Sequence, residues 1–297
     1  MVKKISIIGA GGVGSNLAFN ILNNLGIEQL VLLDINQNQA KAVAYDLEDT
    51  RGILDFSTQV EGTKNYSKIR NSDIVIFSAG IPRKEGMSRL DLLKINAGIA
   101  KGAAAQIKKY APNSIVIAIT NPLDIITYLI LKETGFSAKK VMGMGPSLDT
   151  SRLLNILAKK TKMSASSCQA FVFGPHSKDM IIHSTSRNQR ITKEVVDQVK
   201  YRGAKIVQLF KNKSAVFGPS LVCFKLIEAI SNNKNQIIPV SVLLNGEYGL
   251  KNICLGNRCL INKTGVAKVL EENLTRAQLR KLKKISLTLQ ETLKKIS

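Results

Sequence analysis

The sequence contains no tryptophan, only two histidines and four cysteines, and 21 acidic residues against 43 basic ones. Its longest apolar stretches, such as Ile115–Ile119, are far shorter than the roughly 20 residues that a membrane-spanning helix requires. Four cysteines in 297 residues are too few for a disulfide framework, and Cys254 and Cys259 lack the second close pair of a zinc site. We therefore expect a cytoplasmic protein with reduced thiols, without a metal site and without a membrane partner.

The shortage of acidic residues leaves a net charge of +22, which is compatible with a nucleic-acid or anionic-membrane partner. The basic residues are, however, scattered along the chain, and aromatic residues make up only 5% of it, which leaves little for base stacking. A hydrophobic fraction of 44% is typical of a globular protein with a substantial core. The composition therefore predicts a folded protein without specific nucleic-acid binding.

Short apolar runs alternate with helical patterns in the first half of the chain. Two of these runs, Asp73–Ser78 and Ser114–Thr120, are continuously apolar, as in strands that are buried on both faces of a parallel sheet. This βαβα order predicts an α/β fold with a doubly wound parallel sheet. The predicted strands are Lys4–Ile8, Leu30–Leu33, Asp73–Ser78 and Ser114–Thr120, and the predicted helices are Val13–Leu25, Gln37–Asp49 and Leu90–Lys109.

The pattern changes near residue 144, and we place a domain boundary there, between residues 1–143 and 144–297. The second part mixes helices and short strands, which predicts a smaller α+β domain. Its last helix begins with Thr275-Arg-Ala-Gln278, the pattern of a capping box. The other predicted elements are the helices Asp149–Lys160, Thr192–Phe210 and Pro219–Ser231 and the strands Gln169–Phe173, Ile237–Leu244, Ile253–Leu255 and Arg258–Ile261.

A glycine-rich turn joins the first predicted strand to the first predicted helix. Gly9-Ala10-Gly11-Gly12-Val13-Gly14 has the spacing G-x-G-x-x-G, which lets a helix N-terminus approach a pyrophosphate closely. Asp34 ends the second strand 20 residues after Gly14, where a carboxylate binds the adenosine ribose and repels a 2′-phosphate. The pattern predicts a dinucleotide site that prefers NAD to NADP, although a bare turn with an incidental aspartate is the alternative.

Two arginines lie on a loop that follows the strand Asp73–Ser78. Arg83 and Arg89 are six residues apart in a segment with glycine and proline, which suits a lid that brings guanidinium groups onto an anion. A solvated basic loop is the equally simple alternative. Asn121 follows another buried strand, at the carboxyl end where doubly wound sheets bind ligands.

Further candidates lie in the second part of the chain. Asp149 and Arg152 are three residues apart, and we expect them on one face at the start of a helix. His176 lies on a loop with glycine and proline, which suits a group that titrates near neutral pH. The other histidine, His183, lies in an apolar run, where a packed strand residue is the simpler interpretation. Spacing alone leaves both a catalytic and a structural role open for His176.

Together these segments resemble the lactate/malate dehydrogenase family, in particular its lactate-dehydrogenase-like malate dehydrogenases. The resemblance runs over essentially the whole chain and includes the segments Arg202-Gly-Ala-Lys-Ile-Val and Ile238-Pro-Val-Ser-Val…Gly246-Glu-Tyr-Gly249. It implies a Rossmann NAD-binding domain followed by a substrate domain, and a homo-oligomer, either a dimer or a tetramer. NAD is the cofactor that it implies.

The resemblance also implies a role for each candidate residue. His176 would donate and accept the proton, and Asp149 would orient it. Arg152 would bind the substrate's C1 carboxylate, Arg83 would bind a second carboxylate, and Arg89 would polarise the carbonyl. Asn121 would hydrogen-bond the substrate. The cofactor contacts implied in this way are Gly9, Ala10, Gly11, Gly12, Val13, Gly14, Asp34, Asn96, Ile119, Thr120 and Asn121.

The implied activity is that of an NAD-dependent malate dehydrogenase, which interconverts (S)-malate and oxaloacetate, a reaction of the tricarboxylic acid cycle. The alternatives are an L-lactate dehydrogenase or another 2-hydroxyacid dehydrogenase, and a basic nucleic-acid-binding protein on a dehydrogenase scaffold. Ser177-Lys178 follows the histidine where the family commonly has Gly-Asp. We expect the charge of Lys178 to lower the pKa of His176 by repulsion.

Overall fold

The fold is built on one nine-stranded sheet, whose strands have the order β3-β2-β1-β4-β5-β6-β9-β10-β11 among the residues that are described. The computed structural model describes residues 2–82, 87–184, 190–211 and 214–296. Strands β1 to β6 are parallel, and their order is that of a Rossmann sheet. These strands are β1 (Lys4–Ile8), β2 (Gln29–Leu33), β3 (Gln59–Thr63), β4 (Ile74–Phe77), β5 (Ile115–Ala118) and β6 (Val141–Gly143).

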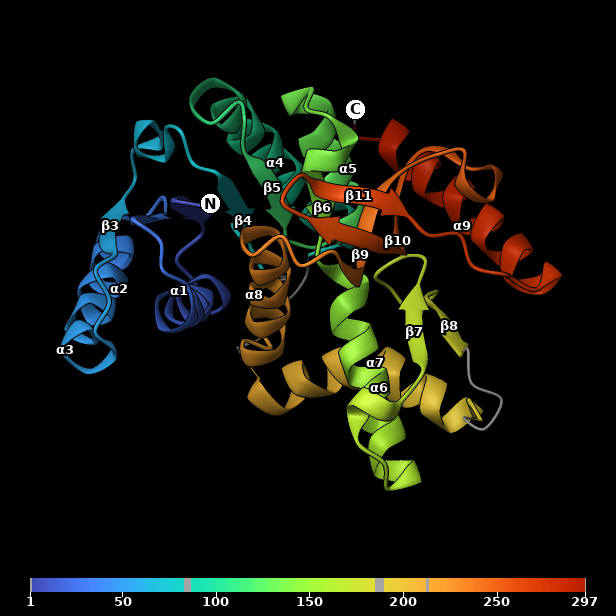
Figure 1. The fold of residues 1–297 in the computed structure, drawn as a ribbon. Coiled ribbons are helices and arrows are strands. Elements are labelled where there is room, and N and C mark those ends of the chain that lie inside the picture. Colours follow the sequence, from blue (N-terminus) through green and yellow to red (C-terminus); the bar gives the residue numbers. More distant parts are fainter. Residues whose placement is uncertain (1, 83–86, 185–189, 212–213, 297) are drawn as a thin grey trace.

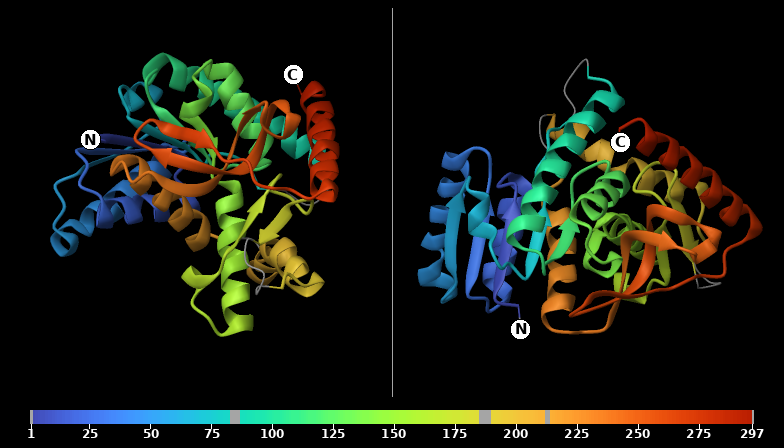
Figure 2. Two further views of the ribbon diagram at one scale, coloured as in Figure 1. Left: turned by 45° about the vertical axis from the view of Figure 1, so that its right-hand side comes forward. Right: turned by 90° about the horizontal axis from the view of Figure 1, so that it is seen from above.

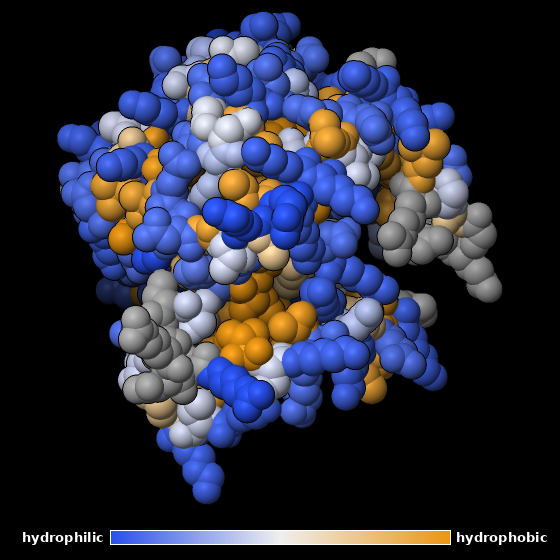
Figure 3. Space-filling view, turned by 90° about the vertical axis from the view of Figure 1, so that its right-hand side faces the viewer, coloured by the Kyte–Doolittle hydropathy of each residue, from blue (hydrophilic) through white to orange (hydrophobic). Residues whose placement is uncertain are grey.

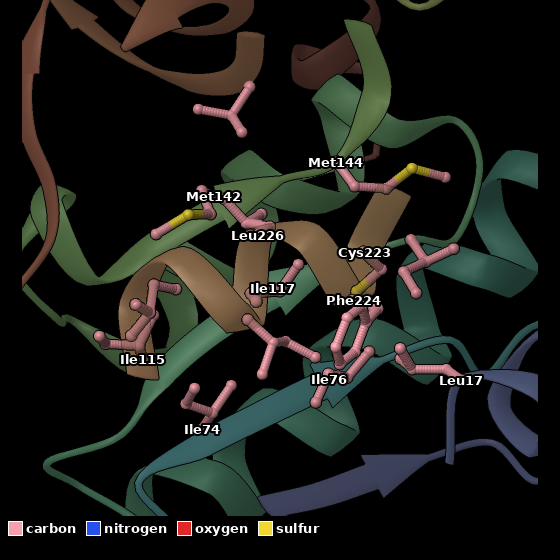
Figure 4. Packing of buried hydrophobic residues seen from close by; sticks show 14 of the residues in the cluster. Leu17, Ile74, Ile76, Ile115, Ile117, Met142, Met144, Cys223, Phe224 and Leu226 are labelled. Carbon is pink, nitrogen blue, oxygen red and sulfur yellow. The ribbon is translucent and has the colours of Figure 1, made fainter. Parts of the chain in front are cut away.

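The central strands are apolar throughout because both faces of the sheet are covered. Successive side chains of a strand point to opposite faces, so Ile74 and Ile76 of β4 enter one core and Val75 and Phe77 enter the other. The first face is covered by α1 (Gly12–Asn24) and α8 (Phe217–Ser231), as Figure 4 shows for Leu17 and Phe224. The second is covered by α4 (Arg89–Tyr110) and α5 (Leu123–Thr134). The predicted doubly wound sheet is therefore confirmed.

The second part of the chain adds to this sheet and also extends away from it. Strands β9 (Gln236–Asn245), β10 (Lys251–Asn262) and β11 (Gly265–Val269) are antiparallel, and β9 joins β6 through the pair Gly143 and Ser241. Helix α6 (Gly145–Thr161) runs from the sheet to the hairpin β7 (Ala170–Phe173) and β8 (Ile181–Ser184) and to α7 (Lys193–Phe210), as Figure 1 shows.

The two ends of the molecule are occupied by helices that are far apart in the sequence. Helices α2 (Gln37–Asp49) and α3 (Arg51–Leu54) lie at the end next to β3, and α9 (Arg276–Lys294) lies at the other end in all views of Figures 1 and 2. The predicted capping box of α9 is present, since Thr275 and Gln278 exchange hydrogen bonds. No helix in the described ranges is long and apolar enough to cross a membrane.

The structure corrects the predicted elements in three places. Helix α6 begins at Gly145, so Asp149 lies in its second turn and not at its start. The two predicted strands Ile253–Leu255 and Arg258–Ile261 form the single strand β10. The sequence patterns also missed β3, β6, α5 and β11, which are short or, in the case of α5, apolar on most sides.

Candidate active site

The glycine-rich turn has the geometry that its spacing predicts. Gly9 has a φ of +111°, and a Cβ at this position would lie 2.7 Å from the backbone nitrogen of Ala79. A Cβ on Gly14 would lie 1.9 Å from the Gly9 carbonyl oxygen, so α1 reaches the strand only because this residue is glycine. Gly11 has no atom within 4 Å of its Cβ position. The turn therefore presents the start of α1 to open space, as a pyrophosphate site requires.

Asp34 lies beside this turn, at the end of β2. Its Oδ2 accepts a hydrogen bond from the Ala10 N–H at 2.8 Å, and its Oδ1 accepts one from the Asn36 N–H at 2.9 Å. The carboxylate is thus held in place by the backbone on both sides. Each oxygen has a further lone pair for a ribose hydroxyl.

A cavity of about 650 Å³ connects the glycine-rich turn with Asp34. Sequence analysis missed two of its lining residues, Gly98 and Gly102 of α4, at which a Cβ would meet nothing within 4 Å. A side chain at either position would therefore project into free space. Two glycines four residues apart destabilise a long helix. Their presence was therefore the sequence signal that could have indicated a functional role for these two positions.

We expect the substitution Asp34→Ser to narrow the preference for NADH over NADPH by on the order of 1–3 kcal/mol, because the charge that repels a 2′-phosphate is removed together with a ribose acceptor. The measurement is the ratio of kcat/KM for the two cofactors. Asp34→Asn is the matched variant, since it keeps the shape of the side chain and an oxygen acceptor for the Ala10 N–H, while it removes the charge and the acceptor of the Asn36 N–H. An unchanged cofactor ratio in both variants would rule out this role of Asp34.

The carboxyl end of β5 is linked to the far end of this cavity by Asn96 of α4. The Asn96 Oδ1 accepts the Ile81 N–H at 2.9 Å, and its Nδ2 donates to the Asn121 carbonyl at 2.9 Å. Thr120 donates its hydroxyl hydrogen to the Ala79 carbonyl at 2.7 Å, and Ile119 is buried. Asn96 therefore fixes the backbone around the cavity, while Asn121 itself is exposed.

Of the two arginines predicted on a lid, only the backbone of Arg89 lies within the described residues. Arg83 lies outside them, so its predicted contact with a second carboxylate stays a prediction. The backbone of Arg89 begins α4, where the side chain of Ser88 accepts the Asp91 N–H and the Asp91 carboxylate accepts the Ser88 N–H. This capping box fixes the point at which the loop becomes helix.

His176, Asp149 and Arg152 are brought together, although His176 is 27 residues from Asp149. The His176 Nδ1 lies 2.6 Å from the Asp149 Oδ2, and the Arg152 Nη1 lies 3.1 Å from the Asp149 Oδ1. The Asp149 side chain is 1% exposed, whereas His176 and Arg152 are 17% and 15% exposed. The buried carboxylate therefore orients an imidazole and a guanidinium that both reach the surface of the site.

A second buried carboxylate, Asp124 of α5, holds the same loop from another side. Its Oδ2 accepts the His176 N–H at 2.9 Å, and its Oδ1 accepts the Ser241 hydroxyl at 2.6 Å. Burial raises the pKa of Asp124, while these two hydrogen bonds oppose the rise. Sequence analysis missed Asp124, and the only signal was an acidic residue directly after Asn121-Pro-Leu and before the apolar pair Ile125-Ile126.

We expect Asp124→Ala to lower the free energy of unfolding by about 1–3 kcal/mol, because two buried donors lose their acceptor. Asp124→Asn should have a smaller effect, since its carbonyl can accept the His176 N–H and its amide can donate to Ser241. Urea denaturation of the three proteins measures the difference. Equal stability of the native protein and Asp124→Ala would show that these bonds contribute nothing.

The charges around His176 raise its pKa above the ordinary value for histidine. Burial alone would lower it, but the charge of Asp149 and its hydrogen bond to the ring outweigh burial, with a smaller contribution from Asp124. Arg152 opposes them. The expected lowering by Lys178 is therefore wrong. The Lys178 ammonium lies instead over the Tyr201 ring, 4.9 Å from its centroid.

His183 has the packed position that its sequence context indicates. It lies on β8 opposite Phe171, with ring centroids 5.2 Å apart, and its ring also meets that of Phe173 edge-on at 6.4 Å. The interpretation of His183 as a packed strand residue is thus confirmed.

A Rossmann sheet with a glycine-rich turn, an aspartate at the end of its second strand and a histidine–aspartate pair defines a dinucleotide-dependent oxidoreductase. The chain belongs to the lactate/malate dehydrogenase family. Residues 3–143 match its NAD binding domain, and residues 146–297 match its alpha/beta C-terminal domain. NAD is accordingly the cofactor.

Individual relatives resemble the chain over its whole length. The malate dehydrogenase of Methanosarcina mazei is 38% identical, with 99% of each chain covered. The structure of malate dehydrogenase from Archaeoglobus fulgidus in complex with NADH has a TM-score of 0.91 at 31% identity, with 99% of each chain covered. The lactate dehydrogenase of Cryptosporidium parvum, complexed with lactic acid and the dinucleotide, has a TM-score of 0.92 at 30% identity, covering 100% of this chain and 98% of that one.

Proposed function

We propose that this protein is an NAD-dependent malate dehydrogenase, which interconverts (S)-malate and oxaloacetate with His176 as the acid and base. The observation that carries the proposal is the buried Asp149 between His176 and Arg152, which places a proton donor next to a carboxylate-binding cation. The full-length similarity to malate dehydrogenases supports the choice of substrate.

The histidine–aspartate pair accounts for proton transfer in both directions. The Asp149 carboxylate holds the proton on Nδ1, so Nε2 of His176 is the nitrogen that exchanges a proton with substrate. In oxaloacetate reduction, imidazolium gives the Nε2 proton to the carbonyl oxygen while C2 receives a hydride. In malate oxidation, neutral imidazole takes the hydroxyl proton. The Asp149 charge stabilises the imidazolium in either direction.

Substrate orientation falls to the arginines and to Asn121. Arg152 would hold the C1 carboxylate through a two-pronged contact, and its link to Asp149 fixes it relative to His176. Gly203 of α7 lies beside this guanidinium, and a Cβ there would lie 3.5 Å from the Arg152 Nη1, an ordinary contact distance. We assign carbonyl polarisation to Arg89, the second carboxylate to Arg83 and a supporting hydrogen bond to Asn121.

The cofactor residues fit a dinucleotide. The open space in front of Gly11 suits a pyrophosphate, and Asp34 suits the adenosine ribose. Asn96, Ile119, Thr120 and Asn121 would shape the nicotinamide end. When bound, the nicotinamide supplies or accepts the hydride, and the protein residues position the substrate and move the proton.

The two directions need opposite protonation states of His176 and should therefore have opposite pH profiles, whose midpoint the raised pKa places above the ordinary value for histidine. Reduction needs imidazolium, so kcat/KM for oxaloacetate should be constant below the His176 pKa and fall as pH rises through it. Oxidation needs neutral imidazole and should rise over the same interval, which lies above about pH 6.5, the ordinary pKa of histidine.

The variant Asp149→Asn tests the cause of this shift, since it removes the charge that raises the pKa. We expect the midpoint of its profile to move to lower pH, in addition to a loss of rate. A midpoint that stays in place would mean that Asp149 does not set the pKa of the group that titrates.

The reaction itself is tested by incubating the protein with NAD and either (S)-malate or (R)-malate. We expect NADH and oxaloacetate to form in equal amounts from (S)-malate only. NADH formation from neither isomer would contradict the proposal.

We further propose that residues 1–143 act as the NAD-binding domain and residues 144–297 as the substrate domain, and that the protein works in the cytoplasm in the tricarboxylic acid cycle. Exposed apolar side chains on the neighbouring helices α1, α2 and α8 support a homo-oligomer, either a dimer or a tetramer. They include Tyr45 and Phe217, which are 63% and 76% exposed.

A further inference from the structure

A separate cavity lies between the loop that carries His176 and the C-terminal helix α9. Its volume is about 330 Å³, and it is lined by Pro175, Ser177 and Asp179 of the loop and by Lys281, Lys284 and Thr288 of the helix. None of these residues lines the cofactor cavity, which is the cavity between the glycine-rich turn and Asp34. The volume is that of a site for a small ligand. Helix α9 lies on the side of the molecule that Figure 3 shows, where hydrophilic side chains surround a smaller apolar area.

The cavity carries more positive than negative charge. Lys281 and Lys284 are three residues apart on α9 and both line it, whereas Asp179 is its one acidic lining residue. In the part of the chain that is described, neither lysine has a carboxylate oxygen within 4.0 Å. Partial burial lowers the pKa of Lys281, the charge of Lys200 on α7 lowers it further, and Asp179 opposes both. An anion would relieve this repulsion.

The lining groups also define the kind of anion. The two ammonium groups provide up to five further donors, because Lys281 already donates one hydrogen to the Met180 carbonyl, and the Ser177 hydroxyl can donate as well. The Thr288 hydroxyl donates to the Lys284 carbonyl at 3.3 Å. Ile285 and Leu289 add an apolar wall on the helix side. This set suits a compact oxyanion with two or more negative charges better than a cation or an uncharged molecule.

Helix α9 is in direct contact with the catalytic loop. The Lys281 Nζ donates to the Met180 carbonyl at 3.3 Å. A Cβ on Gly174 would lie 3.7 Å from Leu282. Within the loop, the Ser177 N–H donates to the Pro175 carbonyl at 2.8 Å, and the Ser177 hydroxyl accepts the Asp179 N–H at 3.1 Å. Any ligand that contacts Ser177 therefore touches the residue next to His176.

We propose that this cavity is an effector site for a small multivalent oxyanion, a carboxylate or a phosphate, which ties α9 to the loop of His176 and thereby regulates turnover. The regulatory half rests on the proposed function, whereas the binding half does not. Asp124 and Asp149 already hold the backbone and ring of His176. A bound anion would hold the third side of the loop and preorganise the imidazole for catalysis.

Binding is tested by calorimetric titration of the full-length protein with citrate and with inorganic phosphate, at constant ionic strength and with saturating NADH. We expect saturable binding of at least one probe at one site per chain. Lys284→Met should weaken it at least tenfold, while Lys283→Met, an exposed lysine of the same helix outside the cavity lining, should leave it unchanged. Binding of phosphate identifies a site for inorganic oxyanions, and binding of citrate alone identifies one for organic polyanions.

Regulation is tested with the same three proteins and the probe that binds. We expect the anion to change kcat/KM for oxaloacetate on the order of fivefold in the native protein and in Lys283→Met, but not in Lys284→Met. Binding of neither probe, or equal binding by Lys284→Met, would overturn the site. Binding without an effect on kcat/KM would overturn the regulation. Since calorimetry requires no turnover, an inactive protein that still binds the anion would contradict only the proposed function.

Discussion

Replacing His176 by asparagine should reduce kcat for oxaloacetate reduction by about 10²–10⁴-fold, the usual contribution of a general acid. Asparagine retains a polar side chain of similar reach but cannot deliver a proton from a charged state at neutral pH. The measurement is steady-state NADH oxidation, together with a fluorescence titration of NADH binding. The dissociation constant for NADH should stay unchanged, because the cofactor cavity is formed by other residues.

The matched control is His183→Asn, which removes the other histidine. His183 packs against Phe171 and Phe173 and has no place in the proposed proton transfer, so this variant should lose stability before it loses catalytic rate. If His176→Asn retained most of its activity while His183→Asn did not, the acid and base would have to be reassigned to His183.

The variant Arg83→Gln should change the choice of substrate. Oxaloacetate and pyruvate share the carboxylate and carbonyl assigned to Arg152 and Arg89, but only oxaloacetate has a carboxylate for Arg83. With pyruvate, the guanidinium would be desolvated against a methyl group, a penalty that falls on the wrong substrate. We expect kcat/KM for oxaloacetate to fall by about 10²-fold, or about 2.7 kcal/mol, and kcat/KM for pyruvate to rise.

Lys84→Gln is the control for this experiment, because it removes a positive charge from the neighbouring position of the same loop. It should leave the ratio of the two kcat/KM values close to that of the native protein. A ratio that does not move in Arg83→Gln, or that moves equally in both variants, would remove the basis for assigning the second carboxylate to Arg83.

The parallel sheet was predictable because its signals are local. Strands such as Ile74–Phe77 are buried on both faces and therefore continuously apolar. Strand β10 was divided in the prediction because Gly256 interrupts its apolar run. In the structure, Gly256 continues the strand and exchanges backbone hydrogen bonds with Gly174, at the start of the loop that carries His176. A Cβ on Gly256 would lie 2.6 Å from the Gly174 carbonyl oxygen, so this glycine marks a close approach and not a break.

The site was predictable where a motif carries its own geometry, as with Gly9 to Gly14 and the pair Asp149 and Arg152. Contacts between segments that are far apart in the sequence could not be predicted, because no motif or spacing relates such segments. Asp124 meets His176 and Ser241 across 52 and 117 residues, and no sequence spacing relates these three positions. The pKa of His176 was expected to fall because Lys178 is close to it in the sequence. In the structure, burial lowers the pKa, but the carboxylates of Asp149 on α6 and Asp124 on α5 outweigh burial and raise it.

The most direct test of the central proposal is a parallel assay of NADH oxidation by the native protein with oxaloacetate and with pyruvate. Measured under identical conditions, the two kcat/KM values give the substrate preference without reference to any variant. We predict a preference for oxaloacetate of at least about 10²-fold, the discrimination expected from one desolvated charge facing its counter-charge or a methyl group. A preference for pyruvate would contradict the assignment as a malate dehydrogenase and favour a lactate dehydrogenase.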